Sequence, residues 1–216
     1  MKKLSLTLSV IGVVALAVSA NANLLVNGGF DTGNYNGWTA VSAQSPDGPF
    51  TSGANFFTVS SPDGSPYIGG AAASYGTKNV VIAQQITLPN VAGTVDVSFQ
   101  GWTTNQQSSG APGGQFDTYS QVGYDPTGGV DPTAASVIWS GKVGADATWE
   151  TQSVSAANVP GGTGTVFVST TQLYALQWNV NYYDNVQANV VPEPSSILAL
   201  ATGMFGLAGV VLRKRS

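Results

Sequence analysis

Between residues 23 and 189 the chain alternates short apolar-polar runs with clusters of turn-forming residues, and it shows no sustained helical period. The clearest run, Thr94–Trp102, places Val95, Val97 and Phe99 on one face, which is the period of two expected of a half-buried strand. Further strands are predicted at 80–88, 136–141, 165–170 and 176–190. Because glycine-rich turns separate them, the pattern predicts an all-β sandwich or jelly roll over residues 23–189.

The composition excludes several kinds of chemistry. The 216 residues include neither Cys nor His, so no disulfide forms and no Ser-His-Asp or Cys-His mechanism operates within this chain. Residues 23–190 contain two Lys against ten Asp or Glu. This acidic balance offers no basic patch for phosphates, which argues against nucleic acid as a partner and disfavours binding to anionic lipid.

The first 22 residues have the three parts of a secretory signal peptide. Lys2 and Lys3 precede an apolar run at 4–18, and Ala20 and Ala22 form a small-x-small cleavage site. The sequence therefore predicts that residues 1–22 form a signal helix that is removed after export. An uncleaved membrane anchor is the alternative, for which the run is short, because a span needs about 20 apolar residues.

Residues 190–216 also have three parts in order. Pro192-Glu193-Pro194, a stiff element that cannot continue a strand or a helix, is followed by an apolar stretch at Ser195–Leu212 and then by Arg213-Lys214-Arg215. As a helix the apolar stretch measures about 27 Å, close to the hydrocarbon thickness of a bilayer, about 30 Å. It is predicted to be a transmembrane helix that the basic cluster stops on the cytoplasmic side, so that the domain faces outward.

This tail resembles the PEP-CTERM sorting signal, which combines a Pro-Glu-Pro motif, a hydrophobic helix and a terminal basic cluster. The resemblance implies delivery by export machinery and cleavage near the motif by an exosortase-type protease, for which the motif is a substrate. It also implies a transient anchor in the inner membrane of a Gram-negative bacterium that makes extracellular polysaccharide, and then residence at the cell surface or outside the cell. An ordinary single-span anchor is the alternative, and it needs no such motif.

An N-terminal strand at 23–30 is predicted to lie beside the closing strand, with both ends of the domain at one edge. The opening NLLVNGGFDTGNYNGWT at 23–39 and the closing Tyr183-Asp184-Asn185-Val186 resemble those of galactose-binding-like β-sandwiches, which include many carbohydrate-binding modules. The segments YDPTGGVDP, VIWSG and ATWETQSVSA between them are also similar to bacterial members. The resemblance implies a jelly-roll sandwich flanked by the two terminal helices.

The resemblance also implies a structural calcium site. In similar modules an acidic residue after the opening Phe and an Asp in the last strand hold Ca²⁺, and the matching positions here are Asp31 and Asp184. Because Ca²⁺ takes six to eight oxygen ligands, carbonyls or water would complete the shell. The alternative is that Asp31 caps a turn and Asp184 bonds to backbone. Asp125 and Asp131, each before a proline, are interpreted as turn residues.

A sugar-binding face is predicted on the polar side of the strand at 94–102. Trp102 lies there beside Gln100, and sugars bind to aromatic rings flanked by amides and carboxylates. An exposed Trp on the face of a sheet indicates a binding role. The alternative is that these aromatic rings fill the ends of the core. Trp149, Tyr119 and Tyr183 are further candidates for this face, whereas core positions are predicted for Trp38, Trp139 and Trp178.

Catalysis is not expected. A glycosidase needs two carboxylates that face each other across the scissile bond, and Glu150 is the sole Glu between residues 23 and 190, with no recognisable partner. The sequence therefore predicts an exported, non-catalytic protein of the cell surface or extracellular matrix that binds carbohydrate, in association with exopolysaccharide or a biofilm. The alternatives are a purely structural matrix protein without a ligand and a secreted polysaccharide-degrading enzyme.

Overall fold

The computed structural model describes residues 23–32, 35–41, 56–57, 67–72, 78–89, 93–104, 118–144, 148–172 and 179–192. The predicted signal peptide, the hydrophobic C-terminal segment with its basic end, and Trp178 lie outside these ranges. Among the described residues, no helix is long and apolar enough to cross a membrane.

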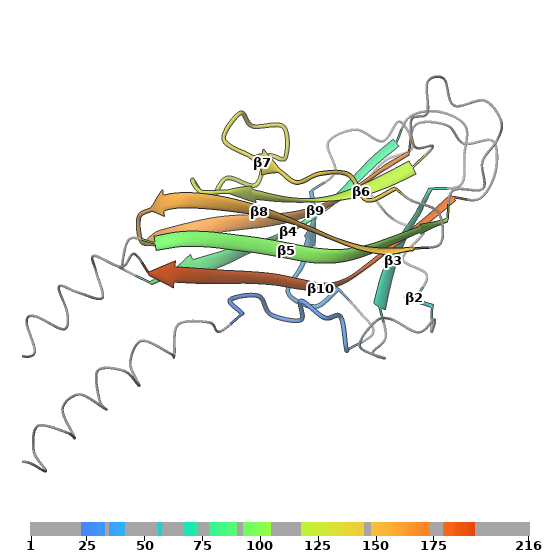
Figure 1. Ribbon diagram of the computed structural model, residues 1–216, viewed down its shortest axis with the longest axis horizontal. Coiled ribbons are helices and arrows are strands. Elements are labelled where there is room, and N and C mark those ends of the chain that lie inside the picture. The colour runs from blue at the N-terminus through green and yellow to red at the C-terminus, as the bar shows by residue number, and fades with distance from the viewer. Residues whose placement is uncertain are drawn as a thin grey trace, which may run out of the picture.

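The described strands form two antiparallel sheets that stack as a sandwich (Figure 1). Sheet A has the order β1-β4-β9-β6-β7 and sheet B the order β2-β3-β10-β5-β8. The strands are β1 (Thr39–Ala40), β2 (Phe56–Phe57), β3 (Tyr67–Ala72), β4 (Lys78–Leu88), β5 (Gly93–Thr104), β6 (Thr118–Asp125), β7 (Ile138–Trp139), β8 (Trp149–Val159), β9 (Gly162–Gln172) and β10 (Asn179–Pro192). The predicted all-β sandwich is confirmed.

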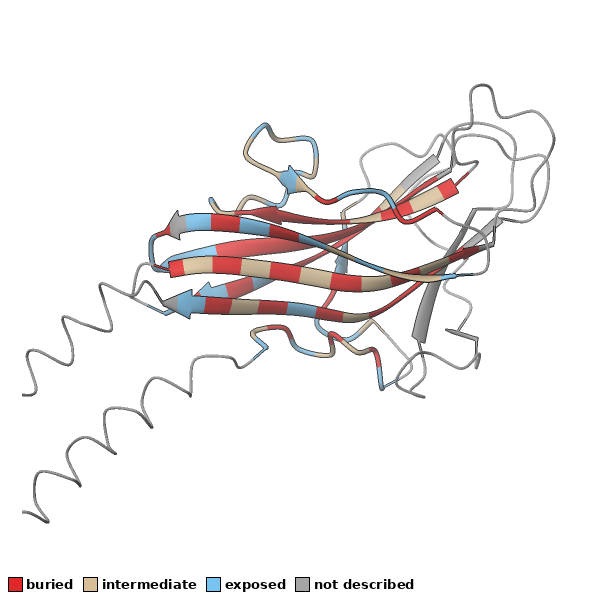
Figure 2. Ribbon diagram, in the orientation of Figure 1, coloured by how far each residue is buried: buried red, intermediate tan, exposed pale blue. Residues whose placement is uncertain are grey.

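The core lies between the sheets and follows the predicted alternation. Val95, Val97 and Phe99 of β5 are at most 1% exposed, while the residues between them are only partly buried. Figure 2 shows this alternation along the strand. From sheet A, Val166 and Val168 of β9 reach the same cluster. Burial of a period-two apolar face is therefore what specifies the register of each central strand.

The predicted strands that are found have shifted ends, and two of the differences have an identifiable cause. The run at 136–141 forms only the short β7, because the residues before it are in turns that bond Ala134 N to Asp131 O and Val137 N to Ala134 O. The closing strand, predicted at 176–190, ends two residues later than predicted, at Pro192, which pairs with Gly93. The ladder ends at the first proline of the Pro-Glu-Pro motif, and the other two residues of the motif lie outside the described ranges.

The segment 23–30 is not the strand predicted from its sequence. It lies beside β10 as expected, with Leu24 N donating to Ala188 O and Val186 N donating to Gly28 O, both at 2.9 Å. Its backbone is a series of turns, however, and Asn27 has a φ of 55°. Asx side chains that bond to nearby backbone compete with extended structure. Asn23 does so here, because its Oδ1 accepts from Leu25 N.

Residues 23–32 and 35–41 close one edge of the sandwich by contacting both sheets. The segment bonds to β10 of sheet B, while the Gln84 side chain of β4 in sheet A both accepts from Val26 N at 2.6 Å and donates to Val26 O at 2.9 Å. β1 then pairs with β4. Because these are long-range bonds, the start of the domain is tied to its last strand and to both sheets.

A cluster of aromatic rings anchors this edge in the core. Phe30 is fully buried, and its ring centroid lies 5.6 Å from that of Trp38, 5.6 Å from that of Tyr183 and 6.3 Å from that of Tyr35. The core position predicted for Trp38 is confirmed. The hydroxyls of Tyr35 and Tyr183 lie 3.3 Å apart. Burial raises the pKa of Tyr35 to about 12 and that of Tyr183 well above its usual value.

We expect the domain to lose stability as the pH rises from about 10 to about 12. The unfolded chain ionises tyrosine above pH 10, whereas the folded chain keeps Tyr35 neutral to about 12, so the stabilisation is complete below pH 10 and lost above it. Two pKa units correspond to roughly 2–3 kcal/mol for the complete loss, of which about half is reached at pH 11. Urea unfolding at pH 8 and at pH 11 measures the change in the free energy of unfolding. In Tyr35→Phe this free energy should fall less between the two pH values. An equal free energy of unfolding at both pH values would contradict it.

The outer face of sheet A is covered by a second apolar cluster. Val81, Ala83 and Phe167 are buried there, and Val41, Val137 and Trp139 pack against them. Trp139 is thus half-buried in this outer cluster rather than in the main core where the sequence placed it. Its ring lies over Gly123, where a Cβ would approach Cε3 within 2.7 Å. Sheet B differs, because its central strands carry mainly polar side chains on their outer face.

Candidate functional site

An aromatic row crosses three neighbouring strands on the outer face of sheet B. Trp102 of β5 is opposite Tyr182 of β10 on one side and opposite Trp149 of β8 on the other. Residues opposite each other on paired strands share a face of the sheet. The face of Trp102 is the outer one, because Phe99, three residues earlier in the strand, points into the core. The rings of Trp102 and Tyr182 lie 5.1 Å apart at 50°. Trp102 and Trp149 are half-buried and Tyr182 is 7% exposed. We call these three residues the aromatic row.

Polar side chains occupy the next register position on the same face. Gln100 of β5 is opposite Asp184 of β10 and Thr151 of β8. Its Oε1 accepts a hydrogen bond of 2.9 Å from Asn185 Nδ2, which orients the amide and leaves its NH₂ group to donate elsewhere. Thr151 is exposed and Asp184 is fully buried. An amide and a hydroxyl therefore flank the aromatic row.

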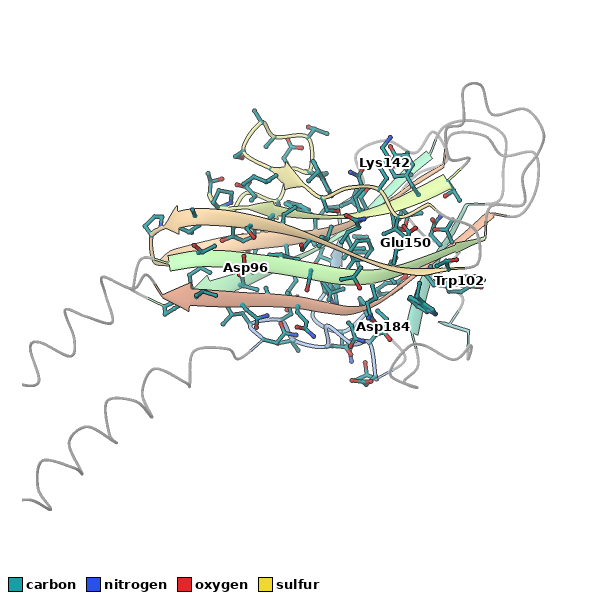
Figure 3. The ribbon with its side chains drawn as sticks, viewed as in Figure 1. Asp96, Trp102, Lys142, Glu150 and Asp184 are labelled. Carbon is teal, nitrogen blue, oxygen red and sulfur yellow. The ribbon has the colours of Figure 1, made fainter. Side chains whose placement is uncertain are left out.

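The polar character continues toward the other end of β5. Ser98 is opposite Ser153, and Asp96 is opposite Ser155, whose hydroxyl donates to Asp96 Oδ1 at 2.5 Å. Figure 3 shows Trp102 and Asp96 near opposite ends of the strand. The face thus presents aromatic rings at one end and hydroxyls, amides and a carboxylate along the rest.

Two of the candidates from the sequence lie away from this face. Tyr183 is opposite Gly101, an inner-face position, and is 3% exposed in the core. Tyr119 lies on the outer face of sheet A, where Lys142 Nζ is 4.1 Å from its ring centroid. The structure therefore brings together Trp102, Gln100 and Trp149, and it replaces Tyr183 by its neighbour Tyr182.

The sequence pattern missed Tyr182 because β10 changes its alternation. The register of β10 against β5 shifts between Asp184 and Gln187, where Asn185 has a φ of 49°. A bulge of this kind reverses which residues face the core. Val186 and Ala188 point into the core after the bulge, whereas Tyr183 does so before it. An Asn inside a strand pattern, which tolerates positive φ, is the signal that could have located the bulge.

The two residues proposed for calcium lie on adjacent segments. Val186 N bonds to Gly28 O, which brings the segment of Asp31 against the strand of Asp184. Asp31 is exposed, and Asp184 is fully buried with its Oδ1 accepting from Asn185 N at 2.7 Å. The part of the chain that the structure describes contains no group of three or more His, Cys, Asp or Glu able to hold a metal. Carbonyls or water would have to complete such a site.

The charged residues of the domain are unevenly placed. The five strands of sheet B contain neither Lys nor Arg. Lys78 begins β4 of sheet A, and Lys142 lies over Tyr119 of β6, apart from Trp102 in Figure 3. Glu150 pairs with Gly101 and so occupies an inner-face register position, not the face of the aromatic row. The face around Trp102 is therefore neutral to acidic.

Comparison with known proteins adds to this picture. The PEP-CTERM protein-sorting motif matches residues 190–215, and no curated protein matches the sequence. The fold is similar to that of TmCBM61 in complex with β-1,4-galactotriose, at a TM-score of 0.53 and 14% identity, covering 77% of this chain and 97% of that chain. It is also similar to the enzymatically active domain of tailspike protein 4 of bacteriophage CBA120, at 0.52 and 14%, covering 78% of this chain and 21% of that chain. The chain thus joins a β-sandwich, whose fold is similar to that of TmCBM61, to a PEP-CTERM sorting motif.

Proposed function

We propose that this is an exported, non-catalytic protein that binds carbohydrate through the outer face of sheet B. The observation that carries the proposal is the aromatic row, with the Gln100 amide and the Thr151 hydroxyl beside it. Aromatic rings stack on the apolar faces of sugars, and adjacent amides and hydroxyls bond to their hydroxyl groups. The fold shared with TmCBM61 supports the same use.

The charge of the face favours an uncharged glycan. A polyanionic chain lying on sheet B would meet Asp96 and no Lys or Arg from the strands of that sheet. Repulsion between the Asp96 carboxylate and a polyanionic glycan would weaken binding, and this repulsion is strongest at low salt. We therefore expect neutral polysaccharides to bind and polyuronates to bind weakly.

The sorting motif supports export and delivery to the cell surface. We propose the finer course as well: removal of residues 1–22, transient anchoring in the inner membrane of a Gram-negative bacterium through Ser195–Leu212, and cleavage by an exosortase-type protease near Pro192-Glu193-Pro194. The processed protein would then reside at the surface or in the exopolysaccharide of a biofilm. Because Glu150 lies on the inner-face register, no carboxylate pair is proposed for catalysis.

Electrophoresis through gels that contain polysaccharide tests the proposed function. We expect the protein to be retarded in a gel with β-1,4-galactan or another neutral glycan, relative to a gel without glycan, and to migrate normally with a polyuronate. Retardation that depends on neutral glycan supports binding. Normal migration in every gel would contradict it and would favour a purely structural role, whereas release of sugar from the glycan would favour a degradative enzyme.

We also propose a structural Ca²⁺ at Asp31 and Asp184, completed by backbone carbonyls and water. The site would join the opening segment to β10, where Val186 N already bonds to Gly28 O. Ions that bind only the folded state stabilise it. We expect EDTA to lower the midpoint of thermal unfolding, and Asp31→Asn to reduce that effect. Asp31 is exposed, so its substitution tests the metal with little disturbance of packing. An equal effect of EDTA on both proteins would contradict this site.

A further inference from the structure

Among the described residues, three side-chain oxygen atoms are buried without a hydrogen-bond partner: the hydroxyl of Tyr124, a core residue, Asp125 Oδ2 at the end of β6, and Thr165 Oγ1 of β9. Asp125 is 0% exposed; its Oδ1 accepts from Thr127 N and from Thr127 Oγ1, both at 2.8 Å, while its Oδ2 has no partner. Thr165 of β9, also 0% exposed, is directly opposite Asp125, and its Oγ1 has no partner either. Because opposite residues share a face, Asp125 Oδ2 and Thr165 Oγ1 lie on the same side of sheet A.

This arrangement is costly unless something binds there. A buried hydroxyl without a partner destabilises the folded state, and a buried carboxylate oxygen without a partner does so more strongly. Such groups call for a bound ion or water to account for them. Ca²⁺ is a hard cation that binds oxygen ligands, carboxylates above all, and the Thr165 hydroxyl also has lone pairs that can accept an ion.

Glycine keeps the space next to the carboxylate open. A Cβ on Gly129 would lie 2.8 Å from Asp125 Oδ2, so any other side chain would fill the position beside that oxygen. The loop also lies close to β4 and β9. Gly128 has a φ of 75°, and a Cβ there would lie 2.8 Å from Thr163 O. Gln85 Nε2 donates to Gly128 O at 2.8 Å. The loop after β6 is thus held close to Asp125, and glycine at position 129 leaves the place beside Oδ2 without a side chain.

We propose that Asp125 Oδ2 and Thr165 Oγ1 bind a Ca²⁺ ion, with the remaining ligands supplied by backbone carbonyls of residues 126–130 and by water. The site is on sheet A and is separate from the one proposed at Asp31 and Asp184. A single carboxylate implies weak binding, in the range of about 0.1–1 mM that is typical of extracellular modules. Bound Ca²⁺ would fix the loop after β6 against β9.

The thermal unfolding midpoint of the full chain in detergent, with EDTA or with Ca²⁺ up to about 10 mM, tests this site. All variants carry Asp31→Asn, so that the other proposed site does not contribute. Asp131→Asn is the matched control, because Asp131 begins the same Asp-Pro-Thr sequence and its Oδ1 accepts from Thr133 N and Oγ1 in the same way, but it is exposed. The parent protein carries Asp31→Asn alone. We expect Ca²⁺ to raise the unfolding midpoint of this parent and of the variant that also carries Asp131→Asn.

Two variants remove one proposed ligand each. Asp125→Asn should abolish the Ca²⁺-dependent rise. Thr165→Val keeps the shape and removes the hydroxyl, so it should reduce the rise while leaving the protein as stable as the parent, or more stable, in EDTA. The proposal is overturned if Ca²⁺ does not raise the midpoint of the parent, or if the rise is unchanged in Thr165→Val. The second variant decides the matter even if Asp125→Asn fails to fold.

Discussion

Replacing Trp102 with alanine is expected to abolish retardation in a neutral-glycan gel while leaving the fold intact. Trp102 is the middle member of the aromatic row, opposite both Tyr182 and Trp149, and its ring packs against Tyr182 at 5.1 Å. Truncation of a central aromatic anchor costs about 2 kcal/mol or more in binding, which corresponds to roughly a 30-fold weaker affinity. Affinity electrophoresis measures this loss across a series of glycan concentrations.

The control is Tyr119→Ala, which removes an aromatic ring of similar exposure from the outer face of the opposite sheet. It should retain the retardation of the wild type. Urea unfolding of both variants distinguishes lost binding from lost structure. If Trp102→Ala and Tyr119→Ala are retarded equally, the aromatic row is not the binding surface.

Replacing Phe30 with alanine is expected to cause the largest loss of stability, about 3–5 kcal/mol. Phe30 is fully buried, and its ring contacts those of Tyr35, Trp38 and Tyr183. Removing it leaves a cavity where the opening segment meets both sheets. Since a whole domain is stable by only about 5–15 kcal/mol, this one substitution should leave the domain marginally folded in urea-unfolding measurements.

Val26→Ala is the matched control, because Val26 lies in the same segment but is 66% exposed. Its substitution should change the free energy of unfolding by no more than about 0.5 kcal/mol. The role assigned to the aromatic cluster would be refuted if Phe30→Ala cost no more than this control.

The sequence pattern predicted the elements whose structure depends on local alternation. In β5 the period of two correctly separated Val97 and Phe99 from Gln100 and Trp102, because one face of a central strand must be buried. The sandwich followed from such runs and from the turns between them. The sequence also indicated Trp149 as a candidate for the sugar-binding face. Its register opposite Trp102 brings the two rings to the same face.

The failures arose where structure depends on contacts distant in the chain. The segment 23–30 is apolar enough for a strand, yet its bonds to Gln84 and to β10 are made from turns. Tyr182 and Tyr183 are adjacent, and only the register of β10 against β5, with its shift after Asp184, decides which one joins Trp102. The unpaired oxygens of Asp125 and Thr165 likewise become visible only when β6 and β9 are paired.

The most direct measurement is a crystal structure of the protein with an oligosaccharide from whichever neutral glycan retards it. If the account is right, a sugar ring stacks on Trp102 on the outer face of sheet B, within hydrogen-bonding distance of the Gln100 amide. A sugar bound on the outer face of sheet A, or away from Trp102 altogether, would contradict it.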